Sequence, residues 1–185
     1  MNRHQIGNII SVGYSVVRLN IMRIFSGGKI KTAFIERISP NVVIDIDSKS
    51  KLLLGNKVRI HSGSRITAAR GGVIEIGSNV RINNNCRIAC RDYIVLEEGV
   101  EFGPGVLIYD HDHQFSAESG VVEKEYKTAP IKIGKNSWIG ANTIILRGTE
   151  IGKNCVVGAG SVIKGKYGDN CLIYQERITK IKDIE

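Results

Sequence analysis

Residues 133–168 read IGKNSW IGANTI ILRGTE IGKNCV VGAGSV IKGKYG, six consecutive blocks of six residues that share one pattern. Each block opens on an aliphatic residue: Ile133, Ile139, Ile145, Ile151, Val157 and Ile163. The fifth position of the first five blocks is small: Ser137, Thr143, Thr149, Cys155 and Ser161. A period of six matches neither the 3.6 residues per turn of an α-helix nor the period of 2 of a flat strand. It predicts a chain that turns a corner every six residues and points one aliphatic and one small residue inward, as in a parallel β-helix.

The same pattern continues toward the N-terminus in sets of three large apolar residues spaced six apart, and each set predicts one coil. These sets are Leu54, Ile60 and Ile66; Ile76, Ile82 and Ile88; and Leu96, Phe102 and Ile108. Extra residues near 70–72 and 92–93 fall at one corner of successive coils, and a third insertion at about 110–132 is much longer. Long excursions from a rigid scaffold are usually functional, so this loop is where we expect a site. The sequence therefore predicts a mainly β solenoid domain over residues 31–185.

Residues 1–30 lack the six-residue pattern, and we expect them to form a helical segment. The apolar run Ile9–Phe25 is interrupted by two arginines and is too short to cross a membrane as an unbroken apolar segment. The pair Gly27-Gly28 predicts the end of a helix. The favoured interpretation is a cap over the open end of the solenoid. The alternative is peripheral membrane contact through residues 1–28, because the charges there are basic.

Composition narrows the class of protein and its partners. A length of 185 residues suits one domain, and 42% hydrophobic with only 6% aromatic residues suits a narrow aliphatic core. The net charge of +8 favours anionic partners, but no arginine-rich stretch interleaved with aromatics indicates nucleic acid. The four cysteines form no CxxC pair, so we expect a reduced, cytoplasmic protein without a thiolate metal site.

The long loop carries the residue types of proton-transfer chemistry. Its first part, Tyr109–Phe115, contains His111 and His113 with an aspartate before each of them. Histidine is the side chain whose unperturbed pKa lies near neutrality, which makes it the natural general base, and a neighbouring carboxylate can orient the ring. The alternative is a solvated loop without chemistry, and its place at the one long insertion disfavours that alternative.

Two segments, Pro130–Asn142 and Val156–Ile163, resemble those of a known family, the hexapeptide-repeat acyltransferases. The resemblance covers roughly residues 50–185 and is strongest to the maltose, galactoside and capsular-polysaccharide O-acetyltransferases. It implies a left-handed parallel β-helix, usually a homotrimer, and the handedness rests on the resemblance alone. It also implies transfer of an acetyl group from acetyl-CoA to a hydroxyl of a sugar or glycan.

The resemblance assigns catalytic and acceptor-binding positions residue by residue. The family's catalytic histidine lies eleven residues after the residue that opens the last hexad before the loop, and counting from Phe102 reaches His113. His111 is the reserve candidate. Asn85 and Asp92 match positions that bind the acceptor sugar in the galactoside enzymes; a corner residue in the left-handed backbone conformation is the structural alternative for Asn85.

Cofactor positions follow in the same way. Trp138 matches an aromatic residue that packs beside the pantetheine arm, and backbone N–H groups near Gly140 and Ala141 would stabilise the oxyanion. Ala159 lies in the coil that resembles the cofactor-binding coil of the family. Lys164 and Lys182, like other basic residues near the C-terminus, would hold the phosphates of acetyl-CoA, or belong to a solvated basic tail.

These parts imply direct transfer, in which His113 removes the acceptor proton and no acyl-enzyme forms, at sites shared between subunits of a trimer. One alternative is N-acyl transfer to an amino sugar. Another is a zinc protein similar to the γ-type carbonic anhydrases, with His111, His113 and either His61 or His4 as ligands. The last is a non-catalytic scaffold.

Overall fold

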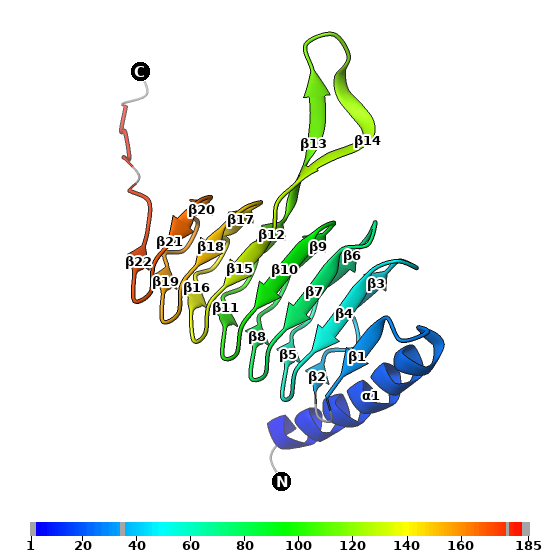
Figure 1. Cartoon of the computed structure of the whole chain (residues 1–185). Coiled ribbons are helices and arrows are strands. Elements are labelled where there is room, and N and C mark those ends of the chain that lie inside the picture. Colours follow the sequence, from blue (N-terminus) through cyan, green and yellow to red (C-terminus); the bar gives the residue numbers. More distant parts are fainter. Residues whose placement is uncertain (1–2, 34–35, 177, 183–185) are drawn as a thin grey trace.

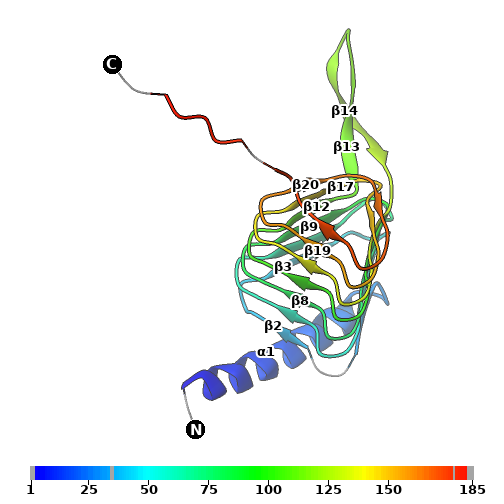
Figure 2. The same ribbon diagram turned by 90° about the vertical axis from the view of Figure 1, so that its left-hand side faces the viewer.

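The computed structural model describes residues 3–33, 36–176 and 178–182, and in the N-terminal helix it describes the side chains from residue 12 onward. The chain forms a three-sided prism of short parallel strands, with one α-helix at the N-terminal end and one hairpin that stands away from the prism (Figure 1). Figure 2 shows the coils as stacked triangles. The mainly β solenoid predicted from the hexads is therefore confirmed.

Each side of the prism is a parallel sheet, and successive strands pass from sheet A to sheet B to sheet C. Sheet A contains β1 (Ile30–Thr32), β4 (Lys51–Leu54), β7 (Val73–Ile76), β10 (Tyr93–Leu96), β15 (Ile131–Ile133), β18 (Glu150–Ile151) and β21 (Lys166–Tyr167). Sheet B contains β2 (Arg37–Ile38), β5 (Arg59–Ile60), β8 (Arg81–Ile82), β11 (Glu101–Phe102), β16 (Trp138–Ile139), β19 (Val156–Val157) and β22 (Leu172–Ile173). Sheet C contains β3 (Val43–Ile46), β6 (Arg65–Ala68), β9 (Arg87–Cys90), β12 (Leu107–Tyr109), β17 (Ile144–Leu146) and β20 (Val162–Ile163). Equivalent residues of neighbouring coils therefore lie side by side along the prism.

The core is the column of residues that open the hexads. All of those named above are buried, and they form one continuous cluster along the prism. The small residues at the fifth position are buried as well, and their hydroxyl or thiol groups have partners. Ser137 Oγ, for example, donates to the Gly152 carbonyl oxygen at 2.8 Å and accepts from the Cys155 amide at 2.9 Å. A small polar residue at this position thus satisfies backbone groups at a corner where strand pairing is interrupted.

The corners explain the many glycines and asparagines. Six asparagines at corners adopt the left-handed conformation, with φ between 56° and 62°: Asn79, Asn85, Asn136, Asn142, Asn154 and Asn170. Asparagine tolerates this region better than most residues. Gly99 has φ of 74°, and a Cβ there would overlap the Asn136 side chain of the next coil. The composition therefore reflects close stacking of corners from coil to coil.

Helix α1 (Arg3–Phe25) lies across the N-terminal coil, as Figure 1 shows, and ends before Gly27 and Gly28, which both have positive φ. Leu19 is buried against the prism. Ser15 Oγ bridges to β2, because it accepts from the Ile38 amide at 2.8 Å and donates to the Ile38 carbonyl oxygen at 2.9 Å. Among the described residues, no helix has the length and hydropathy needed to cross a membrane.

Candidate active site at one corner of the prism

The long insertion expected at about 110–132 is a β-hairpin. Strand β13 (His111–Ser116) pairs antiparallel with β14 (Gly120–Thr128), and the chain rejoins sheet A at Ile131. An excursion that leaves the prism cannot use the parallel ladders, so it satisfies its backbone groups by pairing with itself. The hairpin leaves at the corner between sheets C and A, the corner that also carries the smaller insertions.

A buried carboxylate ties the base of the hairpin to the preceding coil. Asp110 is 0% exposed and accepts hydrogen bonds from the Arg91 amide at 2.9 Å and the Asp92 amide at 2.8 Å. Its Oδ1 also lies 2.9 Å from Nδ1 of His111. Burial raises the pKa of Asp110, but the hydrogen bonds from His111 and from these amides outweigh it and hold the pKa below the ordinary value. The ionised carboxylate therefore places the proton of His111 on Nδ1 and leaves Nε2 as the nitrogen that can accept a proton.

Two histidines and a tyrosine gather on one face of the hairpin. His113 pairs with Tyr126 across the two strands, and their ring centroids lie 4.7 Å apart. The His111 ring lies 5.5 Å from the same tyrosine. The guanidinium carbon of Arg91 lies 3.7 Å from the Tyr126 ring centroid and that of Arg70 lies 5.0 Å from it. The tyrosine ring is therefore held between cations and imidazoles, and the exposed His113 ring faces solvent beside it.

The opposite face of β13 is tied to the following coil. Asp112 forms an ion pair with Arg147 through Oδ2 and Nε at 2.5 Å. Arg91 and Arg147 were not predicted as site residues. Both occupy the corner of the hairpin in neighbouring coils, so stacking of that corner is the signal that could have identified them.

The two acceptor-site candidates lie at different corners. Asp92 adjoins the histidine cluster, because its amide is bound by Asp110. Asn85 lies at the corner between sheets B and C with φ of 59°, and a Cβ at Gly63 would overlap its side-chain oxygen. Its geometry fits the role of a corner residue, and one chain does not bring it to the histidines.

Trp138 and His113 lie on different sides of one chain. Trp138 is 54% exposed and points outward from sheet B, whereas the hairpin leaves from the corner between the other two sheets. Lys164 follows β20 at the corner of the hairpin, and Lys182 is exposed beyond the last strand. A single chain therefore separates Trp138, though not Lys164, from the corner that carries the proposed base.

The corner after β16 is closely packed. A Cβ on Gly140 would lie 2.5 Å from the Ala159 nitrogen, so these two corners stack directly. The Gly140 amide donates to the Val157 carbonyl oxygen at 2.8 Å. That amide is committed to the strand ladder, which corrects the expectation that it serves an oxyanion and leaves Ala141 as the candidate donor.

The described histidines lie at two corners of the prism, His61 between sheets B and C and the other two on the hairpin. His61 follows β5. Its pKa is lowered mainly by burial and, to a smaller extent, by the charges of Arg37 and Arg59. In the part of the chain that the structure describes, no group of three His, Cys, Asp or Glu side chains could hold a metal ion. The side chain of His4 lies outside the described residues.

Comparisons with known proteins agree with the fold. The model of the "Hexapeptide repeat of succinyl-transferase" family matches residues 130–164. The putative lipopolysaccharide biosynthesis O-acetyl transferase WbbJ of Escherichia coli is 30% identical over 119 residues, which are 60% of this chain and 61% of that protein. This chain thus spans about three fifths of the length of that relative.

Two solved structures share the solenoid. AntD, an N-acyltransferase of Bacillus cereus solved with an amino-sugar nucleotide and coenzyme A, superposes with a TM-score of 0.69 at 21% identity over 90% of this chain and 88% of AntD. A hexapeptide-repeat acetyltransferase of Vibrio cholerae, solved with acetyl coenzyme A, superposes with a TM-score of 0.53. The two are 29% identical, and the match covers 63% of this chain and 60% of that one. The prism therefore matches the left-handed β-helix fold of these structures, and residues 130–164 carry the hexapeptide repeat.

Proposed function

We propose that this chain is an acetyl-CoA-dependent O-acetyltransferase that acts on a hydroxyl of a sugar or polysaccharide. The observation that carries the proposal is the pair of histidines on the hairpin, which is anchored by the buried carboxylate of Asp110 at 2.9 Å from His111. Further support comes from the similarity to WbbJ, the putative lipopolysaccharide biosynthesis O-acetyl transferase, and from the acetyl coenzyme A bound to the Vibrio cholerae protein.

His113 is the proposed general base. Its ring is exposed and can reach an acceptor, whereas the His111 side chain is only 14% exposed and its Nδ1 is bound to Asp110. His113 takes the proton of the acceptor hydroxyl as the oxygen attacks the thioester carbonyl. The amide of Ala141 stabilises the oxyanion, the C–S bond then breaks, and the proton passes from His113 to the leaving thiolate.

The proposed assembly is a homotrimer with shared sites. Because Trp138 and His113 lie on different sides of one chain, a complete site needs the hairpin of one protomer opposite sheet B of the next. Closed cyclic symmetry makes three such sites equivalent. Trp138, Ala159, Lys164 and Lys182 would bind acetyl-CoA there, with Asn85 and Asp92 near the acceptor. Sedimentation of the active protein as a monomer contradicts this arrangement.

The acceptor screen separates O-transfer from N-transfer. We expect consumption of acetyl-CoA with hydroxyl-bearing sugars or glycans, and a product whose acetyl group is released by mild alkali because it is an ester. Transfer to an amino sugar gives an amide that resists the same treatment. N-acyl transfer is the alternative because AntD shares the fold, and a predominantly alkali-resistant product contradicts the proposal.

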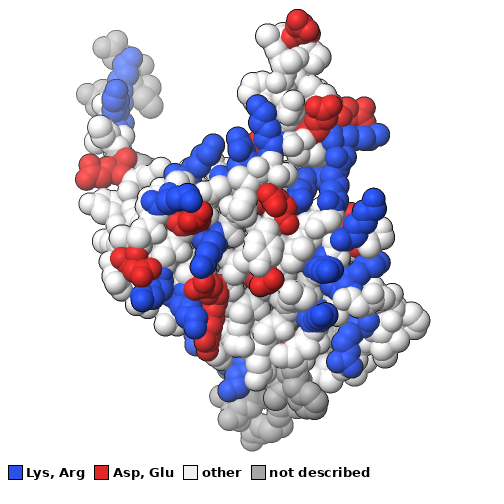
Figure 3. All heavy atoms as spheres, in the orientation of Figure 1, with Lys and Arg blue, Asp and Glu red and all other residues white. Residues whose placement is uncertain are grey.

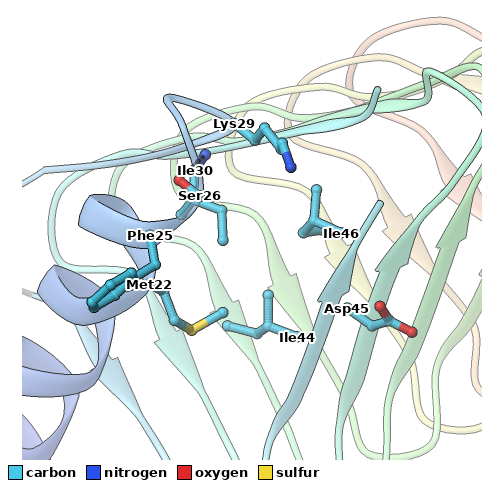
Figure 4. A pocket seen from close by; sticks show the side chains of 8 residues that line it. All are labelled: Met22, Phe25, Ser26, Lys29, Ile30, Ile44, Asp45 and Ile46. Carbon is cyan, nitrogen blue, oxygen red and sulfur yellow. Dashed lines mark hydrogen bonds between the residues drawn. The ribbon is translucent and has the colours of Figure 1, made fainter. Parts of the chain in front are cut away.

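We also propose that α1 rests on the anionic cytoplasmic face of a membrane. Its outward side carries an exposed apolar stripe: Tyr14, Val17, Ile21, Ile24 and Phe25. Beside the stripe, a hollow of about 300 Å³ between Met22 of α1 and Ile44 of β3 opens to solvent (Figure 4). Residues 3–33 contain no acidic side chain and include the exposed Arg23 and Lys31. Apolar and basic groups together favour an anionic bilayer.

Co-flotation with vesicles tests this surface. The trimer should float with vesicles that contain anionic lipid, and Ile21→Ser combined with Ile24→Ser should abolish flotation because both side chains are exposed. Matched neutral vesicles are the control. If the double variant changes only the number of chains in the assembly, the stripe is an interface between copies of the chain.

A further inference from the structure

Sheet B carries a straight row of outward side chains whose order is set by strand register. Arg37 pairs with Arg59, and Arg59 pairs with Arg81. The row then continues through Glu101 to Trp138. Neighbouring strands are about 4.8 Å apart, so the three arginines, here called the arginine row, span about 10 Å along the prism.

Most of the charge in the arginine row is not neutralised. Arg81 forms an ion pair with Glu101 at 3.1 Å. Among the described side chains, those of residues 12–33, 36–176 and 178–182, neither Arg37 nor Arg59 has a hydrogen-bond or ion-pair partner. The two guanidinium groups therefore lie on adjacent strands without an anionic partner in the described part of the chain, an arrangement of like charges that costs stability.

The charges of sheet A are arranged in the opposite way. Figure 3 shows basic and acidic side chains interspersed over that face. Lysines on and beside sheet A form ion pairs: Lys132 with Glu97, Lys135 with Glu98, Lys153 with Asp169, and Lys166 with Glu150. The arginine row differs from these four lysines, because Arg37 and Arg59 have no ion pair among the described side chains.

The field of the arginine row acts on its surroundings. His61 follows β5 directly, and after burial the charges of Arg37 and Arg59 are the causes that lower its pKa. Burial and, after it, these two charges thus disfavour the protonated form of His61. Arginine binds phosphate and carboxylate groups through two parallel hydrogen bonds, so a row of unpaired guanidinium groups is suited to an anionic ligand.

We propose that the arginine row binds the anionic part of the acceptor, a saccharide that carries phosphate or carboxylate groups. This inference rests on the proposed function, because Trp138 on the same row is the residue assigned to acetyl-CoA. From Arg59 to Trp138 there are three strand spacings, about 14 Å. An acceptor that reaches both is longer than one sugar unit, so the ligand is an anionic oligosaccharide or a sugar with a diphosphate-linked group.

The test compares acceptors that differ in charge. The probes are trigalacturonate for carboxylate, UDP-galactose for phosphate, and galactotriose as the matched neutral saccharide. The row variant is Arg37→Gln with Arg59→Gln, and the matched control is Arg65→Gln with Arg87→Gln, an in-register arginine pair on sheet C that also lacks an ion pair among the described residues. Direct binding is measured by titration calorimetry and transfer by release of coenzyme A.

We expect at least one anionic probe to bind more tightly than galactotriose. The row variant should raise the KM and Kd for that probe by about tenfold or more, since charge-assisted hydrogen bonds are lost. The same variant should keep its KM for acetyl-CoA and its weak binding of galactotriose. The control variant should stay within about twofold of the parent, as expected for exposed charges outside the site.

Three results overturn the proposal. The first is an equal loss of affinity for the anionic probe in the row and control variants, and the second is that neither anionic probe binds more tightly than galactotriose. The third is tighter binding of a single-stranded oligonucleotide than of either anionic probe, through the same arginines. Failure of the proposed function looks different. In that case no probe is acetylated, yet an anionic probe still binds and the row variant still loses it.

Discussion

The His113→Ala enzyme is expected to show a kcat lower by about 10²–10⁴-fold, the usual contribution of a positioned general base. The acetyl-CoA affinity should be unchanged, because the residues proposed to bind the cofactor lie on sheet B and near the C-terminus. His113 is exposed on β13 and pairs across the hairpin with Tyr126, so its loss leaves the buried contacts of the prism intact. Single-turnover transfer and a separate acetyl-CoA titration measure the two quantities.

His111→Ala is the matched control, since both rings contact Tyr126. An inactive His111→Ala enzyme beside a nearly normal His113→Ala enzyme assigns the base to the Asp110–His111 pair instead. Mixing His113→Ala chains with Trp138→Ala chains extends the test to the assembly. After subunit exchange some clefts carry both parental residues, so partial recovery of activity is expected. No recovery despite proven exchange removes the shared site.

Asp110→Asn is expected to lower the free energy of unfolding by about 2–4 kcal/mol, because buried donors lose a charged acceptor. Two backbone amides and Nδ1 of His111 point at this carboxylate, which is 0% exposed. An amide group at this position accepts from fewer of them and turns its own N–H toward another donor. Urea unfolding at neutral pH measures the difference.

The pH dependence of the free energy of unfolding at acid pH gives a second test of Asp110. The folded pKa of Asp110 is lower than its unfolded value of about 3.9, so the stabilisation is present above that pH and is lost as the pH falls through the folded pKa. Asp110→Asn should therefore flatten this branch. Asp112→Asn is the control, because its ion pair with Arg147 is partly exposed and should contribute less than about 1 kcal/mol. Equal losses in the two variants contradict the proposed role of the buried carboxylate.

The solenoid was predictable because its constraint repeats. An inward residue such as Ile139 must fill the same space in every coil, and a small residue such as Ser137 must fit every corner, so the period of six is visible in one sequence. The hairpin has no such constraint. Its strands pair with each other outside the prism, and their spacing differs from that of the hexads. The insertion was therefore identified, but its regular structure was not.

The site was predictable only in part, because its contacts cross between coils. The histidines stood out by residue type, whereas Arg91 reaches Tyr126 across 35 residues of sequence and Arg147 reaches Asp112 across an equal distance. The Gly140 amide was misjudged, since its use in the ladder depends on the position of Val157 in the next coil. The separation of Trp138 from His113 follows from the three-sided winding, and the expectation of sites shared between subunits already assumed it.

One corner carries all of the excursions from the prism: the short ones near 70–72 and 92–93 and the hairpin. At that corner the chain can lengthen or shorten without moving any inward residue, because each coil re-enters sheet A in register with the last, as Ile131 does opposite Ile94. The length of the chain at this corner can therefore vary independently of the core. Insertions and deletions at this one edge can diversify what the protein recognises, while the stacked interior is inherited unchanged.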